Sequence, residues 1–238
     1  MSNTQLTCVS GYWKIKNKHN NQFEDNWFKN TLKINCPYVF FGNKESIELI
    51  KHYRGNLPTY YIELEIEDFE SYKYKDKMII HGTHCPSVEL NLIWNEKIFL
   101  INKAKQINPF LSEFFMWVDA GICVYRNNSP PCGSFPNLDK LNKLPKDKLI
   151  YCSTHNVEFK PYLFTKGQYH LYHHVSGTYM LHKDIIEKYA TLYKEYLKLI
   201  DKNDIWTDQV ILTLMYRDNP DLFYKYCDGY GELCSILY

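Results

Sequence analysis

Asp119 has the residue type and the position that chemistry on phosphates or sugars needs. It ends the apolar run Phe114–Val118 and is followed by Ala120 and Gly121. A short unbroken apolar run is typical of a strand buried on both faces, and ligands in open α/β sheets bind beyond the carboxyl ends of such strands. We therefore expect Asp119 at a nucleotide or metal site. A carboxylate that only caps the next turn would leave the same pattern.

Asp208 and Lys97 are further candidates. Asp208 follows Thr207, a possible N-cap, at the predicted start of a helix, where exposed amide groups stabilise an anion. Lys97 lies on the helix directly before the Asp119 strand. Carboxylates and diphosphate oxygens together hold Mg²⁺-type ions, and a lysine adds to the stabilisation of a departing diphosphate. Asp208 as a simple helix-capping acid and Lys97 as part of a solvated face remain open.

His173 and His174 are adjacent, His170 precedes them by three and four residues, and no carboxylate stands at that spacing from the pair. A structural or surface role is therefore as open for this pair as metal binding. The eight cysteines include no Cys-x-x-Cys pair and no zinc-finger spacing. This usage predicts reduced, mostly buried thiols in a reducing compartment.

Hydrophobic periodicity predicts the elements that must position these residues. Strands are expected at 6–13, 37–42, 60–66, 114–118, 149–152 and 175–181, and helices at 25–32, 44–53, 88–107, 183–199 and 210–216. The β-α-β-α-β order of the first half predicts a parallel sheet with right-handed crossovers. The polar and basic loop 14–22 follows the first strand, where α/β nucleotide binders hold a base or ribose. No Gly-x-Gly-x-x-Gly and no Walker lysine loop is present.

Length and composition restrict the class of protein. A chain of 238 residues predicts one α/β domain, which we divide into a nucleotide-binding half at about 1–126 and an acceptor-side half at about 127–238. A net charge of +1 argues against nucleic-acid binding through a broad basic surface. The first residues are polar, and no apolar stretch approaches the roughly 18 residues that span a bilayer. A soluble, cytoplasmic protein without a transmembrane segment is expected.

Several motifs together resemble the HtrL/YibB family, which is grouped with the GT-A-type glycosyltransferases. The segment 91–97, the turn Asn108-Pro109-Phe110 and the strand end 115–122 carry the resemblance. Further matches extend it over most of the chain: Arg54 in the first half, Ser176-Gly177-Thr178, Thr207-Asp208-Gln209 and the tail 229–238.

The resemblance implies a GT-A-like fold, with a mostly parallel central sheet flanked by helices and a smaller acceptor-side lobe. It implies a hexosyl-type transferase that moves a sugar from a nucleotide-diphosphate donor, with UDP favoured, to a glycan or protein acceptor. The expected donor-binding residues are Thr7, Arg54, Trp94, Lys97, Asp119, Ala120 and Gly121, and the expected acceptor or sugar contacts are Gly177, Thr178 and Gln209. Asp208 would be the general base of an inverting reaction, or would orient the sugar or acceptor in a retaining one.

Mn²⁺ or Mg²⁺ is the cofactor that the resemblance implies, usually bound by an Asp-x-Asp at this strand end. Asp119 matches the first acid, but Gly121 stands where the second would be. A ligand from His173, His174 or the tail would have to complete the site. The missing acid also motivates an alternative, a non-catalytic nucleotide- or carbohydrate-binding module. A structural or interaction protein is a third hypothesis, motivated by the many tyrosines.

Overall fold

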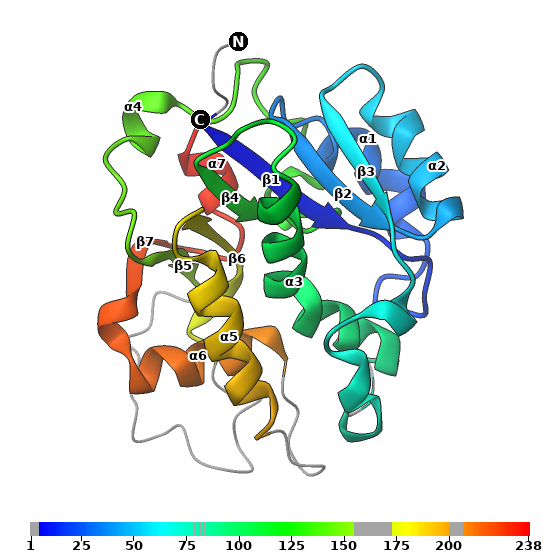
Figure 1. The fold of residues 1–238 in the computed structure, drawn as a ribbon. Coiled ribbons are helices and arrows are strands. Elements are labelled where there is room, and N and C mark those ends of the chain that lie inside the picture. Colours follow the sequence, from blue (N-terminus) through cyan, green and yellow to red (C-terminus); the bar gives the residue numbers. More distant parts are fainter. Residues whose placement is uncertain (1–4, 79, 81, 83, 155–172, 200–206) are drawn as a thin grey trace.

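A single seven-stranded sheet runs through the protein in the order β3-β2-β1-β4-β6-β5-β7 (Figure 1). The computed structural model describes residues 5–78, 80, 82, 84–154, 173–199 and 207–238. The strands are β1 Leu6–Gly11, β2 Tyr38–Gly42, β3 Thr59–Glu63, β4 Phe114–Trp117, β5 Leu149–Ser153, β6 Val175–His182 and β7 Phe223–Asp228. The six predicted strands are present with shifted ends, and β7 is a strand that the tail sequence did not predict.

Most strand pairs are parallel, as predicted, and β6 is the exception. β1 pairs in parallel with β2 and β4, β2 with β3, and β5 with β7. β6 lies antiparallel between β4 and β5, with Phe114 opposite His182. A fully buried strand has the same apolar run in either direction, so the sequence pattern did not reveal this reversal. As a result, the first residues of β6 lie beside the carboxyl ends of β4 and β5.

Helices cover both faces of the sheet (Figure 1). One face packs against α3 Val88–Ile107, α5 Ile186–Leu197 and α6 Asp208–Asp218. The other packs against α1 Phe28–Thr31, α2 Lys44–Arg54, α4 Leu138–Leu141 and α7 Leu233–Ile236. β4 shows the division, because Phe115 and Trp117 belong to the first core and Phe114 and Met116 to the second. Burial on both faces explains its continuous apolar run.

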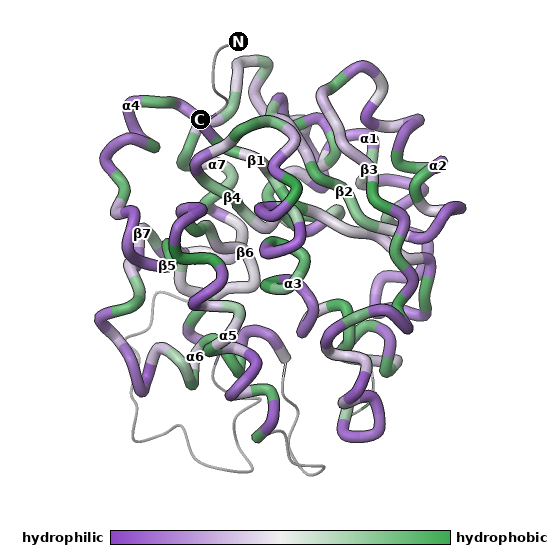
Figure 2. The backbone as a smooth tube through the Cα atoms, viewed as in Figure 1, coloured by the Kyte–Doolittle hydropathy of each residue, from purple (hydrophilic) through white to green (hydrophobic). Residues whose placement is uncertain are grey.

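Polar residues gather at the periphery. Hydrophobic residues line β2, β4 and much of α3, whereas the segment after β3 is mostly hydrophilic (Figure 2). That segment forms two short 3₁₀ helices, Ile66–Asp68 and Tyr72–Lys77. Two more 3₁₀ turns lie at Cys123–Tyr125 and Pro220–Leu222. The predicted helix 25–32 is instead a π-helical turn, Phe23–Trp27, followed by α1.

The helices that carry the candidate residues have defined ends. The Ser87 and Thr207 side chains cap α3 and α6 by accepting from Leu90 N and Val210 N, which confirms Thr207 as an N-cap. α3 spans the predicted residues and ends at Asn108 in the left-handed conformation, where Asn is tolerated better than most residues. The Asn108 side chain also bonds the backbone of Ser112, and so fixes the turn into β4.

The predicted nucleotide-binding and acceptor-side halves share this one sheet and meet where β4 pairs with β6. Their functional division stays a prediction. Within the described residues, no helix combines the length and the apolar character needed to cross a membrane.

Candidate active site

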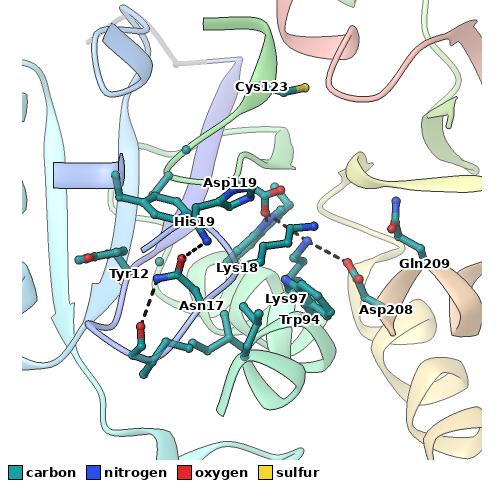
Figure 3. A pocket seen from close by; sticks show the side chains of 18 of the residues that line it. Tyr12, Asn17, Lys18, His19, Trp94, Lys97, Asp119, Cys123, Asp208 and Gln209 are labelled. Atoms are coloured by element: carbon teal, nitrogen blue, oxygen red, sulfur yellow. Dashed lines mark hydrogen bonds and ion pairs between the residues drawn. The ribbon is translucent and has the colours of Figure 1, made fainter. Parts of the chain in front are cut away.

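Lys97, Asp119 and Asp208 converge at the carboxyl edge of the sheet, although they are far apart in sequence. The Lys97 ammonium nitrogen lies 3.1 Å from Asp119 Oδ1 and 2.9 Å from Asp208 Oδ2. It also donates to the Gly177 carbonyl oxygen at 3.3 Å. The Lys97 and Asp208 side chains are 2% and 5% exposed, while that of Asp119 is 28% exposed. The sequence singled out all three, and Figure 3 shows them meeting from β4, α3 and α6.

Two aromatic side chains hold the Asp119 carboxylate. Trp117 Nε1 donates to Oδ1 at 2.7 Å, and the Tyr230 hydroxyl donates to Oδ2 at 2.8 Å. Tyr230 comes from the tail and is bracketed by Gly229 and Gly231, both with positive φ. The sequence offered a tail residue only as one candidate for a missing metal ligand, and it did not identify Tyr230 as a hydrogen-bond donor to Asp119. Its place in a Gly-Tyr-Gly turn was the available signal, because such a turn permits backbone conformations that side chains otherwise resist.

The charges of the trio are interdependent. Burial tends to raise the pKa of Asp119, but the Lys97 charge and the bonds from Trp117 and Tyr230 hold it below the usual value. Burial raises the pKa of Asp208 despite the opposing effect of Lys97. Burial tends to lower the pKa of Lys97, and the two carboxylates overcome this and raise it. Lys97 therefore stays protonated, and Asp119 carries the more firmly ionised carboxylate.

Gly177 on β6 leaves the space in which the trio meets. A Cβ at this position would lie 2.8 Å from Lys97 Nζ, 3.0 Å from Asp208 Oδ2 and 3.5 Å from the Tyr230 hydroxyl. A side chain would thus displace the ammonium or a carboxylate. This agrees with the sequence interpretation that a strand glycine marks a close approach. Gly177 contacts the trio through its carbonyl oxygen and leaves space for it. The contact with acceptor or sugar that the resemblance implied for Gly177 stays a prediction.

Gly121 is enclosed by aromatic rings. A Cβ there would lie 2.4 Å from Phe23 Cε1 and 3.0 Å from Trp27 Cε3. The Gly121 carbonyl oxygen accepts from Arg126 Nε at 2.9 Å, and the Arg126 guanidinium carbon lies 3.8 Å from the centre of the Trp27 ring. The position where an Asp-x-Asp would have its second acid is therefore occupied by aromatic packing and bordered by a cation.

A cavity of about 430 Å³ opens over these residues. Its polar and charged lining consists of Asn17, Lys18, His19, His84, Lys97, Asp119, Arg126, Thr154, His173, Asp208 and Gln209. Figure 3 labels seven of these side chains, those of Asn17, Lys18, His19, Lys97, Asp119, Asp208 and Gln209. Its aromatic lining consists of Tyr12, Trp13, Phe23, Trp94, Trp117 and Tyr230. The loop after β1 contributes Asn17 to His19, as expected for a loop that follows the first strand of a nucleotide-binding sheet. Sequence reasoning named that loop but not Lys18 or Arg126 individually.

Of the expected donor-binding residues, Trp94, Lys97, Asp119, Ala120 and Gly121 line the cavity. The Trp94 ring is half-buried, and Lys18 Nζ lies 5.8 Å from its centre. Gln209, an expected acceptor or sugar contact, also lines the cavity. The cavity lining thus includes both expected donor-binding residues and an expected acceptor contact, and ligand binding at these residues stays a prediction.

Arg54 and Thr7 lie outside the cavity lining, so their positions do not fit the expectation that they bind the donor. Arg54 is buried, stacks on Tyr38, and donates to the carbonyl oxygens of Leu32, Ile34, Cys36 and Pro58 and to the Thr59 hydroxyl. These partners lie before or at the amino ends of β2 and β3. The Thr7 hydroxyl is buried against that of Ser112. Both residues satisfy internal polar groups rather than meet a ligand.

Thr178 and His174 also lie outside the cavity lining. Strand residues alternate between faces, so Thr178 faces the core opposite to the one that Gly177 approaches. The His174 ring makes a 2.9 Å hydrogen bond with the Tyr151 hydroxyl, and burial lowers the His174 pKa to about 4. Neither position fits the sugar contact or metal ligand that was expected. His173 does line the cavity, with its ring centre 6.2 Å from that of His84.

The described residues do not fit the metal ion that the GT-A resemblance implies. Both Asp119 oxygens already accept hydrogen bonds, and Lys97 lies against Oδ1. Gly121 has no room for a second carboxylate. Within the described ranges, no three His, Cys, Asp or Glu side chains are grouped closely enough to hold an ion. Mn²⁺ or Mg²⁺ therefore stays a prediction without a matching set of ligands in this part of the chain.

Residues 49–233 match the family described as "Bacterial protein of unknown function (HtrL_YibB)". The chain belongs to this family. No curated protein matches it. Among solved structures, apo mouse xyloside xylosyltransferase 1 is similar, with a TM-score of 0.51 and 16% identity over 93% of this chain and 84% of that one. Core-mannan synthase A of Aspergillus fumigatus, in a form with Mn and GDP, has a TM-score of 0.53 and 10% identity over 94% and 73%.

These similarities show that the HtrL/YibB chain has a glycosyltransferase fold of the GT-A type, as the sequence resemblance predicted. They say nothing about which residues act or which ligands bind. The residues that act and the ligands that bind have to be inferred from the geometry of the cavity. It combines aromatic surfaces, two cations from loops, and a carboxylate held in a fixed orientation.

Proposed function

We propose that this HtrL/YibB protein is a glycosyltransferase that moves a sugar from a nucleoside-diphosphate-sugar donor, with UDP favoured, to a hydroxyl group of a glycan or protein acceptor. One observation carries the proposal. The cavity at the carboxyl edge of a GT-A-type sheet holds aromatic rings, cations and the oriented Asp119 carboxylate together. A nucleotide sugar offers a complement to each: a flat base, a diphosphate and sugar hydroxyl groups.

The loop after β1 and Trp94 are suited to the nucleoside. The half-buried Trp94 ring offers an apolar face, and stacking of a base on an aromatic ring is favourable for any base. Asn17 accepts from His19 N at 2.8 Å, which holds this polar loop in a tight turn at the cavity. The nucleoside would therefore bind to a preformed surface.

Asp119 is suited to a sugar hydroxyl. A carboxylate has about four acceptor positions. Lys97, Trp117 and Tyr230 use three of them. The remaining position and the 28% exposure leave room for one hydroxyl donor from the ligand. Such a bond would fix the donor relative to the sheet, and it does not depend on a metal ion.

In the proposed reaction, an acceptor oxygen forms a bond to the anomeric carbon while the bond from that carbon to the diphosphate oxygen breaks. The nucleoside diphosphate leaves with the bonding electrons, and the proton of the acceptor hydroxyl passes to an oxygen of this departing diphosphate. Negative charge builds on the departing diphosphate, so fixed positive charge near it lowers the barrier. The cavity supplies such charge from the loops that carry Lys18 and Arg126.

Asp208 fits a positioning role better than the general-base role considered for an inverting reaction. Its side chain is 5% exposed and its Oδ2 lies against the Lys97 ammonium, so an acceptor hydroxyl has little access to it. We propose that Asp208 fixes Lys97. Gln209, the next residue on α6, lines the cavity and would contact the sugar or acceptor.

A panel of UDP- and GDP-sugars tests the proposal. We expect at least one donor to bind, as measured by calorimetry, and to be hydrolysed slowly or transferred to a sugar acceptor. Asp119→Asn should bind that donor roughly tenfold or more weakly, because a charge-assisted hydrogen bond is lost. Lys16→Gln, at an exposed position in the loop before Lys18, is the matched control and should behave as wild type.

Failure of every nucleotide and nucleotide sugar to bind would refute the proposed function. Binding without hydrolysis or transfer to any acceptor would instead favour the non-catalytic binding module. In that case Asp119→Asn would still weaken binding, because the contact with the ligand is the same in both functions.

A further inference from the structure

The cavity contains two cations that no carboxylate of the described residues neutralises. Lys97 is paired with both Asp119 and Asp208. Lys18 and Arg126 also line the cavity, but neither forms an ion pair with a described Asp or Glu. Unbalanced positive charge in a concave site attracts anions from solution.

Lys18 reaches the cavity from the loop after β1. Figure 3 shows its side chain extending toward the region where Lys97 and Asp119 lie. Its pKa is lowered by partial burial and by the nearby charges of Arg126 and Lys97, while Asp119 opposes this effect. The Lys18 ammonium is thus held close to other cations, and a bound anion would relieve their repulsion.

Arg126 is fixed by the two contacts described above, between Nε and the Gly121 carbonyl oxygen and between the guanidinium and the Trp27 ring. Within the described residues the Arg126 guanidinium donates hydrogen bonds only through Nε, so its two terminal amino groups remain for a ligand. It therefore places a rigid fork of donors beside the turn where an Asp-x-Asp would have its second acid.

We infer that Lys18 and Arg126 bind the diphosphate of the donor and take the place of a divalent metal ion in this site. This inference rests on the proposed function and specifies how its donor is held. The diphosphate of a nucleotide sugar carries two negative charges, which these two cations match. A guanidinium binds phosphate oxygens in a planar fork, and an ammonium binds them as a point charge. The crowded Gly121 and the Asp119 carboxylate, which already has three partners, leave these residues without a matching set of metal ligands.

Calorimetric titrations of the full chain with UDP and with GDP, in EDTA and in MnCl₂, test the inference. We expect the Kd of the better nucleotide to agree within about twofold in the two buffers. Lys18→Gln should weaken its binding about tenfold or more, because a charge-assisted bond is lost. Lys16→Gln should leave the Kd unchanged. Uridine or guanosine, which lack the diphosphate, should bind the wild type and Lys18→Gln equally.

Arg126→Lys provides a second test that keeps the charge and removes the fork. We expect it to bind the nucleotide more weakly than wild type and more tightly than Arg126→Gln. A dependence of the wild-type Kd on ionic strength that becomes shallower in Lys18→Gln would support direct pairing with phosphate. Lys18→Gln changes an exposed loop residue, so loss of folding does not explain its effect.

The result that overturns the inference differs from the one that overturns the proposed function. Nucleotide binding that requires Mn²⁺ and is abolished by EDTA would refute the inference and leave a metal-dependent transferase. Unchanged binding by Lys18→Gln and Arg126→Gln would also refute it. If neither nucleotide binds in either buffer, the cavity is not a nucleotide site, and the proposed function is refuted as well.

Discussion

Replacing Lys97 with methionine should destabilise the protein strongly at neutral pH. Lys97→Met keeps a long apolar side chain but removes the charge that lies 2.9 Å from Asp208 and 3.1 Å from Asp119. Breaking a buried pair by removing one partner typically costs about 3–5 kcal/mol. We assign most of this to Asp208, which is 5% exposed, because solvent screens part of the Asp119 charge at 28% exposure.

Guanidinium unfolding at pH 7 and pH 5 measures this effect. For a denaturant slope of about 5 kcal/mol/M, a loss of about 3–5 kcal/mol lowers the midpoint by roughly 0.6–1 M. Burial already raises the folded pKa of Asp208 above its usual value, and loss of the opposing Lys97 charge raises it further. A carboxyl whose pKa is raised in the folded state makes the protein more stable as the pH falls through that pKa. The difference in unfolding free energy between wild type and Lys97→Met should therefore be smaller at pH 5.

The double variant Lys97→Met/Asp208→Asn isolates the cause. It removes the buried unpaired charge, so it should be more stable than Lys97→Met alone at pH 7. A deficit below about 1 kcal/mol that is the same at both pH values would refute our account of the trio as a buried charge network.

Three further predictions follow from the same contacts. Gly121→Asp should lose about 1–3 kcal/mol of stability and gain no Mn²⁺ binding by calorimetry, because its Cβ would overlap Phe23. Gly133→Asp is the control, because a Cβ at that position meets nothing within 4 Å. A stable Gly121→Asp variant that binds Mn²⁺ would contradict the packing argument. Arg54→Lys should lower stability by about 2–4 kcal/mol without changing the Kd for UDP, because it removes guanidinium hydrogen bonds to backbone carbonyl oxygens outside the cavity. Weaker UDP binding by the folded variant would instead support a role for Arg54 in donor binding. Tyr230→Phe removes a hydrogen bond that lowers the pKa of Asp119, so the acid limb of nucleotide-sugar binding should move to higher pH. An unchanged pH profile of nucleotide-sugar binding would count against the proposed contact between Asp119 and the sugar.

Local patterns predicted the elements of this fold because burial and capping act over a few residues. The apolar run of β4, the α3 span and the Thr207 cap are examples. The direction of β6 was not predictable in this way, since it depends on the route of the chain rather than on side-chain periodicity. β7 was missed because half-exposed aromatic residues at a sheet edge lack a clean alternation.

The candidate site was predictable where chemistry and position coincide in one motif. Asp119 at a strand end and Asp208 at a helix start had both. Arg54 was predicted at the donor site because the sequence does not distinguish an arginine that donates to backbone carbonyl oxygens from one that donates to phosphate. Lys18 and Arg126 were missed individually because lysine and arginine in loops are usually solvated, and only the fold shows that these two line one cavity.

The contacts of the last ten residues have a consequence for the order of synthesis. Tyr230 bonds Asp119, its carbonyl oxygen accepts from the Cys123 thiol, and the Cys234 carbonyl oxygen accepts from the Tyr125 hydroxyl. The tail thus contacts the segment after β4, which is made more than a hundred residues earlier. During translation the amino-terminal strands emerge first, and the Asp119 carboxylate lacks its Tyr230 partner until residue 230 has been made. A ribosome-bound fragment that ends before Tyr230 therefore holds an incomplete cavity, in which Asp119 lacks one of its hydrogen-bond donors.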